Sequence, residues 1–119
     1  MELFENSNLL PEVQQAIKEM GFERPTEIQS QAIPFLLANK RDLIALAQTG
    51  TGKTAAFGLP IISKIDLSNS TPQALIICPT RELCLQIERD LKNFGKYLPL
   101  NTLAVYGGAS INDQLTWLR

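Results

Sequence analysis

The chain has 119 residues, 45% of them hydrophobic, a composition typical of one folded domain rather than of a disordered segment. Its 11 basic and 12 acidic residues give a net charge of −1, which excludes the broad positive field that drives non-specific nucleic-acid binding. No basic leader precedes an apolar stretch, and no apolar run approaches the roughly 20 residues of a membrane span. We therefore expect a soluble, cytoplasmic protein whose nucleic-acid contacts, if any, are local.

An amphipathic helix is predicted over residues 9–20. Apolar side chains recur at helical spacing from Leu10 to Met20. Pro11 suits the first turn of this helix, and Gly21 follows it as a stop signal.

A second helix is predicted from Thr26 to about Ala38. Thr26 and Gln29 have the spacing of a capping box, in which each side chain bonds the backbone N–H of the other residue. Pro34 lies inside this helix and predicts a kink.

Residues 42–65 predict a strand, a glycine-bearing loop and a helix, in that order. Gly50 and Gly52 permit positive φ, which brings successive backbone N–H groups to one point, and the helix that follows adds its partial positive charge. Such a loop holds phosphates, with Lys53 on the β- and γ-phosphates and the Thr54 hydroxyl on Mg²⁺. The alternative is a chance Gly-Lys-Thr turn, but the flanking strand and helix favour nucleotide binding.

Two further strand and helix units follow the phosphate-loop unit. The first contains a continuous apolar run, typical of a strand buried on both faces. The predicted elements are a polar loop at 66–72, a strand at 74–78, a helix from Arg81 to about Tyr97, a strand at 102–106, a turn at Gly107-Gly108 and a last helix capped by Ser110.

This order of elements predicts an α/β fold, with a parallel sheet flanked by helices and preceded by two N-terminal helices. The carboxyl ends of parallel strands share one edge of a sheet. The phosphate loop, the loop at 79–83 and the turn at 107–108 should therefore open on the same side, as a surface suited to phosphorylated ligands.

Cys78 falls in a predicted strand and Cys84 in a predicted helix. Their spacing is neither that of a metal site nor that of a secreted disulfide framework. We therefore expect reduced, structural cysteines, with a redox or ligand role as the alternative.

Each remaining candidate has an ordinary structural explanation when it is taken singly. Thr80 with Glu82 in the first turn is typical of a helix cap, and Gly107-Gly108 is typical of a turn. Gln29 near a helix start is more often a capping or surface residue than a reader of bases, and Phe4 and Phe22 would be core or lid residues.

Taken together, these segments resemble a known family. Residues 21–29, 47–54, 79–83 and 107–108, in this order and at these separations, are similar to the N-terminal part of the first RecA-like domain of a DEAD-box ATP-dependent RNA helicase. The resemblance covers the whole chain, with residues 1–30 as the Q-motif region and 42–119 as the strand and helix units. Ala47, where phosphate loops usually have their first glycine, is also what this family usually has.

The resemblance implies an ATP site. Gln29 would hydrogen-bond the adenine edge, and Phe22 would stack on the adenine ring. The backbone near Arg24 would help to select adenine. Phe4 resembles the family's upstream aromatic residue. A glutamine amide has both a donor and an acceptor, so it can match the N6 donor and N7 acceptor of adenine. The implied phosphate and Mg²⁺ site consists of Ala47, Gln48, Thr49, Gly50, Thr51, Gly52, Lys53 and Thr54.

The resemblance also implies contacts with RNA. Thr80, Arg81 and the backbone of Gly108 resemble positions that touch RNA phosphates, within the segments Pro79-Thr80-Arg81 and Gly107-Gly108. Phosphate contacts carry no sequence information, so binding would be independent of sequence.

Phosphoryl transfer also needs acids that hold Mg²⁺ and orient water, and usually an arginine. No predicted strand ends in paired carboxylates, and Asp113 and Glu82 are better explained as surface or first-turn residues. In the family the Asp-Glu-Ala-Asp motif and the second domain come later in the sequence. We therefore expect this chain to bind ATP without hydrolysing it.

The family also places a strand from later sequence next to the phosphate-loop strand. That order implies a gap between the strand at 42–46 and the one ending at Cys78, with exposed apolar faces and marginal stability of the chain alone. A non-catalytic nucleotide- or RNA-binding module and a different P-loop NTPase are the alternative functions.

Overall fold

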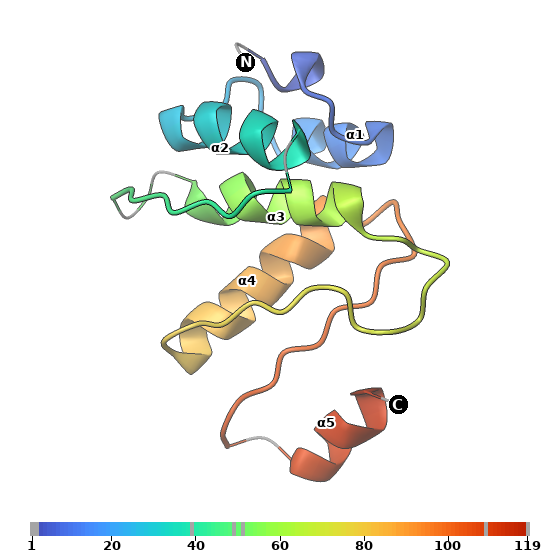
Figure 1. Cartoon of the computed structure of the whole chain (residues 1–119). Helices are drawn as coiled ribbons and strands as arrows, with labels where there is room; N and C mark the ends of the chain where they lie inside the picture. Colours follow the sequence, from blue (N-terminus) through green and yellow to red (C-terminus); the bar gives the residue numbers. More distant parts are fainter. Residues whose placement is uncertain (1–2, 39, 49, 51, 109, 119) are drawn as a thin grey trace.

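The structure is a computed structural model that describes residues 3–38, 40–48, 50, 52–108 and 110–118, the side chains of 117 and 118 excepted. Helices α1 and α2 lie at one end, α3 packs along α2, α4 packs against α3, and α5 lies apart (Figure 1). The described elements are η1 (Phe4–Asn6), α1 (Pro11–Glu19), α2 (Glu27–Ala38), α3 (Lys53–Lys64), α4 (Arg81–Phe94) and α5 (Ile111–Leu118).

The predicted helices are confirmed, and their ends have local causes. Gly21 has φ 87°; its N–H bonds the Lys18 carbonyl at 3.0 Å, and the Phe22 N–H bonds the Ile17 carbonyl at 2.9 Å. This pair of bonds closes α1 with a left-handed glycine. At the last helix, Ser110 Oγ accepts from the Asp113 N–H at 3.3 Å, which confirms the predicted cap.

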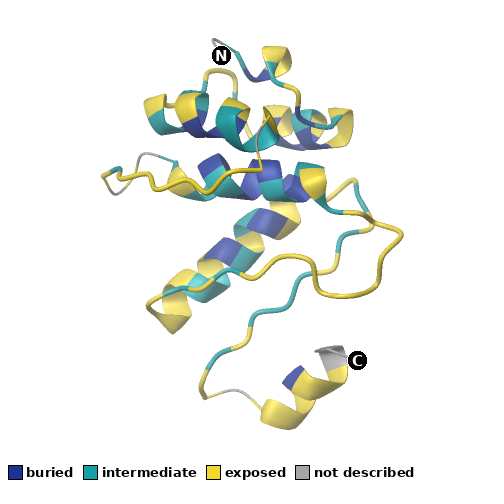
Figure 2. Ribbon diagram, in the orientation of Figure 1, coloured by how far each residue is buried: buried dark blue, intermediate teal, exposed yellow. Residues whose placement is uncertain are grey.

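The core lies between α1, α2, α3 and α4 (Figure 2). Helices α3 and α4 approach closely at Gly58, where an added Cβ would lie 2.9 Å from Leu91 Cδ2 of α4. A side chain at this position would force the Leu91 side chain to shift. The buried cluster consists of Phe4, Leu9, Val13, Ile17, Ile33, Ala55, Leu59, Ile62, Ile87, Leu91 and Phe94.

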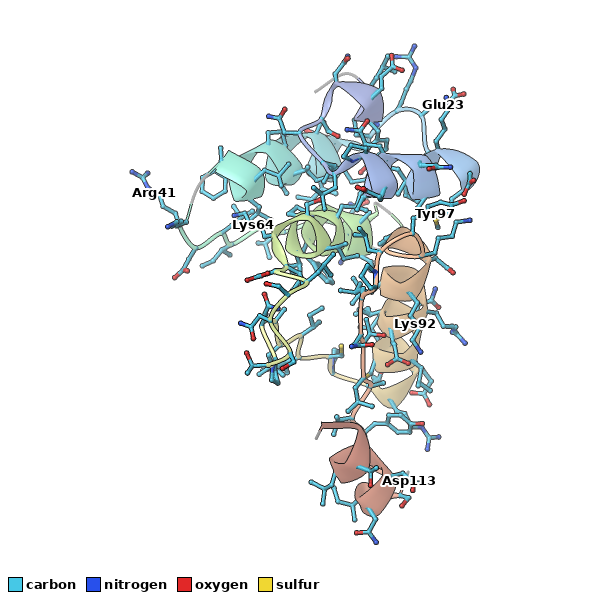
Figure 3. All side chains as sticks on the ribbon, turned by 90° about the vertical axis from the view of Figure 1, so that its right-hand side faces the viewer. Glu23, Arg41, Lys64, Lys92, Tyr97 and Asp113 are labelled. Carbon is cyan, nitrogen blue, oxygen red and sulfur yellow. The ribbon has the colours of Figure 1, made fainter. Side chains whose placement is uncertain are left out.

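A polar cluster joins α1 to the turn after α4. Tyr97 lies beside the end of α1 (Figure 3), and its hydroxyl donates to the Glu19 carboxylate at 2.5 Å. Lys96 Nζ lies 2.7 Å from Glu19 Oε2 and 4.9 Å from the centre of the Tyr97 ring. The bonds from Lys96 and then Tyr97 lower the pKa of Glu19.

The predicted parallel sheet is not found among the described residues. The segments 42–46, 74–78 and 102–106 run as extended chain across the helices, and none is a strand. The physical reason is the lack of pairing: no backbone hydrogen bond joins one of these described segments to another, and a strand exists only where N–H and C=O groups pair with a neighbour.

No helix in the described ranges combines the length and the apolar character needed to cross a lipid bilayer.

Candidate functional site

The phosphate loop has the backbone that its glycines predict. Gly50 has φ 84° and Gly52 has φ 80°, both in the left-handed region. Gly52 is the N-cap of α3, and its carbonyl accepts the Ala56 N–H at 3.2 Å. The first N–H groups of a helix have no partner within the helix, so they are available to an anion at this end. Thr49 and Thr51 lie outside the described residues.

The side chains around this loop are set by the start of α3. Lys53 is exposed and Thr54 is half-buried, while Ala55 and Ala56 are buried and hold the first turn against the core. Before the loop, Ala47 is half-buried and Gln48 is exposed. A lysine and a hydroxyl at the open end of a helix are therefore presented together to a phosphate group.

The described side chains at the phosphate loop provide only part of the ligand set of Mg²⁺. Mg²⁺ keeps several waters and uses phosphate oxygens with one or two protein ligands, so a single hydroxyl such as that of Thr54 suits it. Among the described residues, no three His, Cys, Asp or Glu side chains form a group that could hold a metal ion alone. Any Mg²⁺ here would depend on the phosphates of a nucleotide.

Gln29 connects the start of α2 to the phosphate loop. Its Oε1 accepts the Thr26 N–H at 2.9 Å, and its own N–H donates to Thr26 Oγ1 at 3.4 Å, which confirms the predicted capping box. Its Nε2 donates to the Gly52 carbonyl at 3.2 Å. Only 4% of Gln29 is exposed, so one buried amide joins two segments that are 23 residues apart in the sequence.

These two partners fix the orientation of the Gln29 amide. Turning it over would place Oε1 against the Gly52 carbonyl and Nε2 against the Thr26 N–H, which are pairs of like groups. A glutamine amide has two acceptor lone pairs and two N–H donors, and each bond uses one of them. One acceptor lone pair remains on Oε1 and one donor N–H remains on Nε2, and the position of each is fixed because the amide cannot turn over.

The aromatic residues of this region form a row. The Phe22 ring centre lies 5.9 Å from that of Phe4 and 6.1 Å from that of Phe94. The Phe4 N–H bonds the Glu23 carbonyl at 3.2 Å, which holds the N-terminal segment on the loop before α2. Packing thus explains the positions of both Phe4 and Phe22; stacking of Phe22 on adenine, and a role for the exposed Arg24, stay predictions.

The structure brings two of the predicted RNA-binding segments together. Thr80 caps α4 by accepting the Leu83 N–H at 3.1 Å, as the sequence predicts. Arg81, the first residue of that helix, extends to the second segment, where its Nη1 would lie 3.0 Å from a Cβ added at Gly108. Gly108 has φ 89°, and Pro79 and Gly107 are exposed. A guanidinium group and an open backbone turn therefore share one surface.

A cavity of about 600 Å³ lies beside the phosphate loop rather than on it. It is lined by one face of α2, one face of α3 and the segment before the loop, and its lining includes Lys53 and Lys64. Sequence reasoning did not predict this cavity.

The sequence of this chain is similar to those of known proteins. The DEAD/DEAH box helicase family matches residues 26–119. The ATP-dependent RNA helicase DeaD of Mycobacterium tuberculosis is 50% identical over 117 residues, which are 98% of this chain and 21% of that protein. The chain spans between 21% and 25% of the length of such curated relatives.

Solved structures agree with this match. A DEAD box protein from Methanococcus jannaschii is similar with a TM-score of 0.89 at 34% identity, over 100% of this chain and 32% of that one. Dbp5 of S. cerevisiae, bound to RNA and ADP BeF3, is similar with a TM-score of 0.82 at 34% identity, over 94% of this chain and 30% of that one. The chain has the fold of part of a DEAD-box RecA-like domain. It belongs to the DEAD/DEAH box helicase family.

Proposed function

We propose that this chain is the nucleotide-binding part of an ATP-dependent RNA helicase. The observation that carries the proposal is the Gln29 amide, which holds the start of α2 on the Gly52 carbonyl at the end of the phosphate loop. A group suited to a nucleobase and a backbone suited to a triphosphate are thereby fixed in one unit. The similarity to relatives that carry this activity adds support.

The remaining hydrogen-bonding groups of Gln29 favour adenine. Its free acceptor can take the N6 amino group, and its free donor can bond N7. Guanine presents two acceptors, O6 and N7, at the same edge. Because the amide cannot turn over without losing both protein partners, guanine would leave its acceptor facing another acceptor.

The triphosphate would lie on the N–H groups at the start of α3. Lys53 would balance the charge of the β- and γ-phosphates, and Thr54 would provide a hydroxyl ligand to Mg²⁺. When bound, Mg²⁺ neutralises the phosphate charge. Among the described residues, no three His, Cys, Asp or Glu side chains form a group that could hold a metal ion, and we propose that the chain alone binds ATP without hydrolysing it.

RNA would bind through its phosphates on the surface formed by Thr80, Arg81 and Gly108. A guanidinium binds a phosphate through two N–H groups, and an open glycine turn lets the RNA backbone approach closely. The net charge of −1 agrees with a local contact of this kind. Such contacts position RNA without reading its sequence.

We further infer that the three extended segments pair as parallel strands within a complete domain. Exposure follows the alternation of a strand: Ile44 is 91% and Leu46 93% exposed, and Leu75 and Ile77 are each 86% exposed. Large apolar side chains at alternate positions suit burial in a sheet. We also propose a cytoplasmic location, with which the two free thiols agree; fluorescence of a tagged protein in its own cells would test it.

Nucleotide binding tests the proposal. We expect the chain to bind ATP more tightly than GTP, and Gln29→Ala to reduce this preference at least tenfold. The matched control is Gln31→Ala, because Gln31 lies on the same helix with an exposed side chain and should leave the preference unchanged. Equal binding of ATP and GTP by the unaltered chain would refute the proposed role of Gln29.

ATP turnover with and without RNA separates the helicase from its alternatives. We expect none from the 119-residue chain and RNA-stimulated turnover from a longer protein that contains it. Absence of turnover in the longer protein would favour a non-catalytic binding module. Turnover by the chain alone would refute the argument from the missing acids.

A further inference from the structure

Gln114 is a buried polar residue in a helix, α5, whose other described side chains are exposed (Figure 2). Even the apolar side chains of Ile111 and Leu115 are 62% and 47% exposed, whereas Gln114 is only 7% exposed. Glutamine is usually found at the surface, and burial of an amide costs free energy unless its hydrogen bonds are made. The burial of Gln114 is therefore explained by its hydrogen-bond partners.

Three hydrogen bonds occupy the Gln114 amide. Its Oε1 accepts the Tyr106 N–H at 3.2 Å, and its Nε2 donates to the Tyr106 carbonyl and to the Ser110 carbonyl, both at 3.3 Å. One side chain thus pairs both backbone groups of Tyr106, as a residue of a neighbouring antiparallel strand would. Turning the amide over would place like groups together, so these partners fix its orientation.

These bonds hold both ends of the segment that contains Gly108. Tyr106 precedes the Gly107-Gly108 turn, and Ser110 follows it at the cap of α5. The backbone N–H of Gln114 also bonds the Ser110 carbonyl, at 3.2 Å. A turn whose two flanks are joined through one buried amide has fewer conformations available than a turn held at one end.

Arg81 approaches this turn from the start of α4. A Cβ added at Gly108 would lie 3.0 Å from Arg81 Nη1, so the guanidinium lies beside the glycine backbone. The Arg81 side chain is 54% exposed, and its Nη2 lies 3.9 Å from Glu82 Oε1. An exposed ion pair of this kind is weak, which leaves the guanidinium available to a phosphate.

We propose that Gln114 is a positioning residue for RNA, which holds the Gly107-Gly108 turn beside Arg81 so that the turn and the guanidinium bind the same phosphate group. This proposal rests on the proposed RNA function of Thr80, Arg81 and Gly108. A phosphate group has oxygens for both partners, and donors that are already held in place lose little freedom when they bind. Gln114 acts through the turn, because its own amide is buried and bonded to the backbone.

Alanine substitution tests the role of this amide. Fluorescence anisotropy of a labelled poly-uridine oligonucleotide measures RNA binding, and titration with ATP reports on the fold elsewhere in the chain. We expect Gln114→Ala to bind RNA about fivefold more weakly, the effect of roughly one neutral hydrogen bond, and to bind ATP as the unaltered chain does. The matched control Asn112→Ala, exposed on the same helix, should change neither. Undiminished RNA binding by Gln114→Ala would overturn the positioning role and leave the proposed RNA surface intact.

A double-mutant cycle with Arg81→Ala separates positioning from a general loss of stability. If the turn and the guanidinium share one phosphate, Gln114→Ala should have little further effect on RNA binding once Arg81 is replaced, because the two changes disrupt the same contact. A loss of the same size in both backgrounds would overturn the proposal. Failure of the unaltered chain to bind RNA would instead refute the proposed RNA surface, and the role of Gln114 with it.

Gln114→Glu decides the matter if Gln114→Ala does not fold. The ionised carboxylate has no donor for the Tyr106 and Ser110 carbonyls, whereas the protonated carboxyl has one O–H. Because nearby carbonyl groups raise the pKa of a carboxyl, we expect RNA binding by Gln114→Glu to be weak at about pH 8 and to recover towards that of the unaltered chain at about pH 5.5. Asn112→Asp adds the same charge on the exposed face of α5 and should show no such recovery. A deficit in Gln114→Glu that is equal at the two pH values would overturn the proposal.

Discussion

Replacing Gly52 by alanine should remove the contact between Gln29 and the phosphate loop, and Gly50 provides a matched control. Both glycines have positive φ, 80° and 84° respectively. A Cβ at Gly52 would lie 2.2 Å from Gln29 Nε2, whereas one at Gly50 would meet nothing within 4 Å. The two alanine variants therefore share the backbone strain and differ in the displacement of Gln29.

The structure sets the size of each effect. An alanine in the left-handed region costs about 1–2 kcal/mol, and this applies to both variants. In Gly52→Ala, the Gln29 amide must also leave the Gly52 carbonyl, to which it now donates at 3.2 Å. Loss of one hydrogen bond by a buried amide costs about 1–3 kcal/mol. We therefore expect Gly52→Ala to be about 2–5 kcal/mol less stable than the unaltered chain, and Gly50→Ala about 1–2 kcal/mol less stable.

Two measurements check this prediction. Urea unfolding gives the stability of each variant, and titration with ATP and GTP gives the base preference. We expect Gly50→Ala to weaken both nucleotides equally, and Gly52→Ala to lose most of the preference for ATP as well. If the two variants lose the same stability and both retain the preference, Gln29 does not depend on Gly52 and the reasoning is wrong.

Three further predictions concern other parts of the chain. The pKa of Glu19 is lowered from its usual 4.5 by Lys96 and then Tyr97. Ionised Glu19 therefore stabilises the folded chain fully above its unfolded pKa, and this stabilisation is lost as the pH falls through its folded pKa. Tyr97→Phe should reduce the loss of stability in unfolding curves measured between pH 6 and 3, and an unchanged pH dependence would contradict the role of Tyr97. Arg81→Ala should weaken RNA binding and lower the salt slope by roughly 0.7–1, whereas Arg89→Ala, on an exposed part of the same helix, should do neither. The extended segments of the isolated chain expose Ile44 and Ile77, so the chain should bind the dye ANS. It should also unfold in urea with an m-value below the usual range of about 1–3 kcal/mol per molar. A sharp transition with an m-value inside that range would refute this expectation.

Features that depend on near neighbours in the sequence could be predicted. The capping box at Thr26 and Gln29 needs only a spacing of three residues, and the end of α1 at Gly21 needs only a residue that tolerates positive φ. Both were predicted, and both are confirmed. The helix cap at Thr80 is confirmed for the same reason.

Features that depend on distant partners could not be predicted in the same way. The run at 74–78 has the composition of a strand, yet strand hydrogen bonds need a neighbour that composition does not identify, and the described residues provide none. The approach of Arg81 to Gly108 and the row from Phe4 through Phe22 to Phe94 arise from packing between segments far apart in the chain. The sequence identified these residues as candidates, and only the structure shows which of them lie close together.

The amide of Gln29 has a consequence for attempts to change which nucleotide this protein uses. A residue chosen at position 29 to read guanine would also have to accept from the Thr26 N–H and donate to the Gly52 carbonyl. A substitution that binds the new base but lacks these two groups would lose the hydrogen bond at the start of α2 and the hydrogen bond to the Gly52 carbonyl. If Gln29 reads the base as proposed, retargeting would require coordinated changes in both segments, because one amide group would carry both nucleotide choice and local folding.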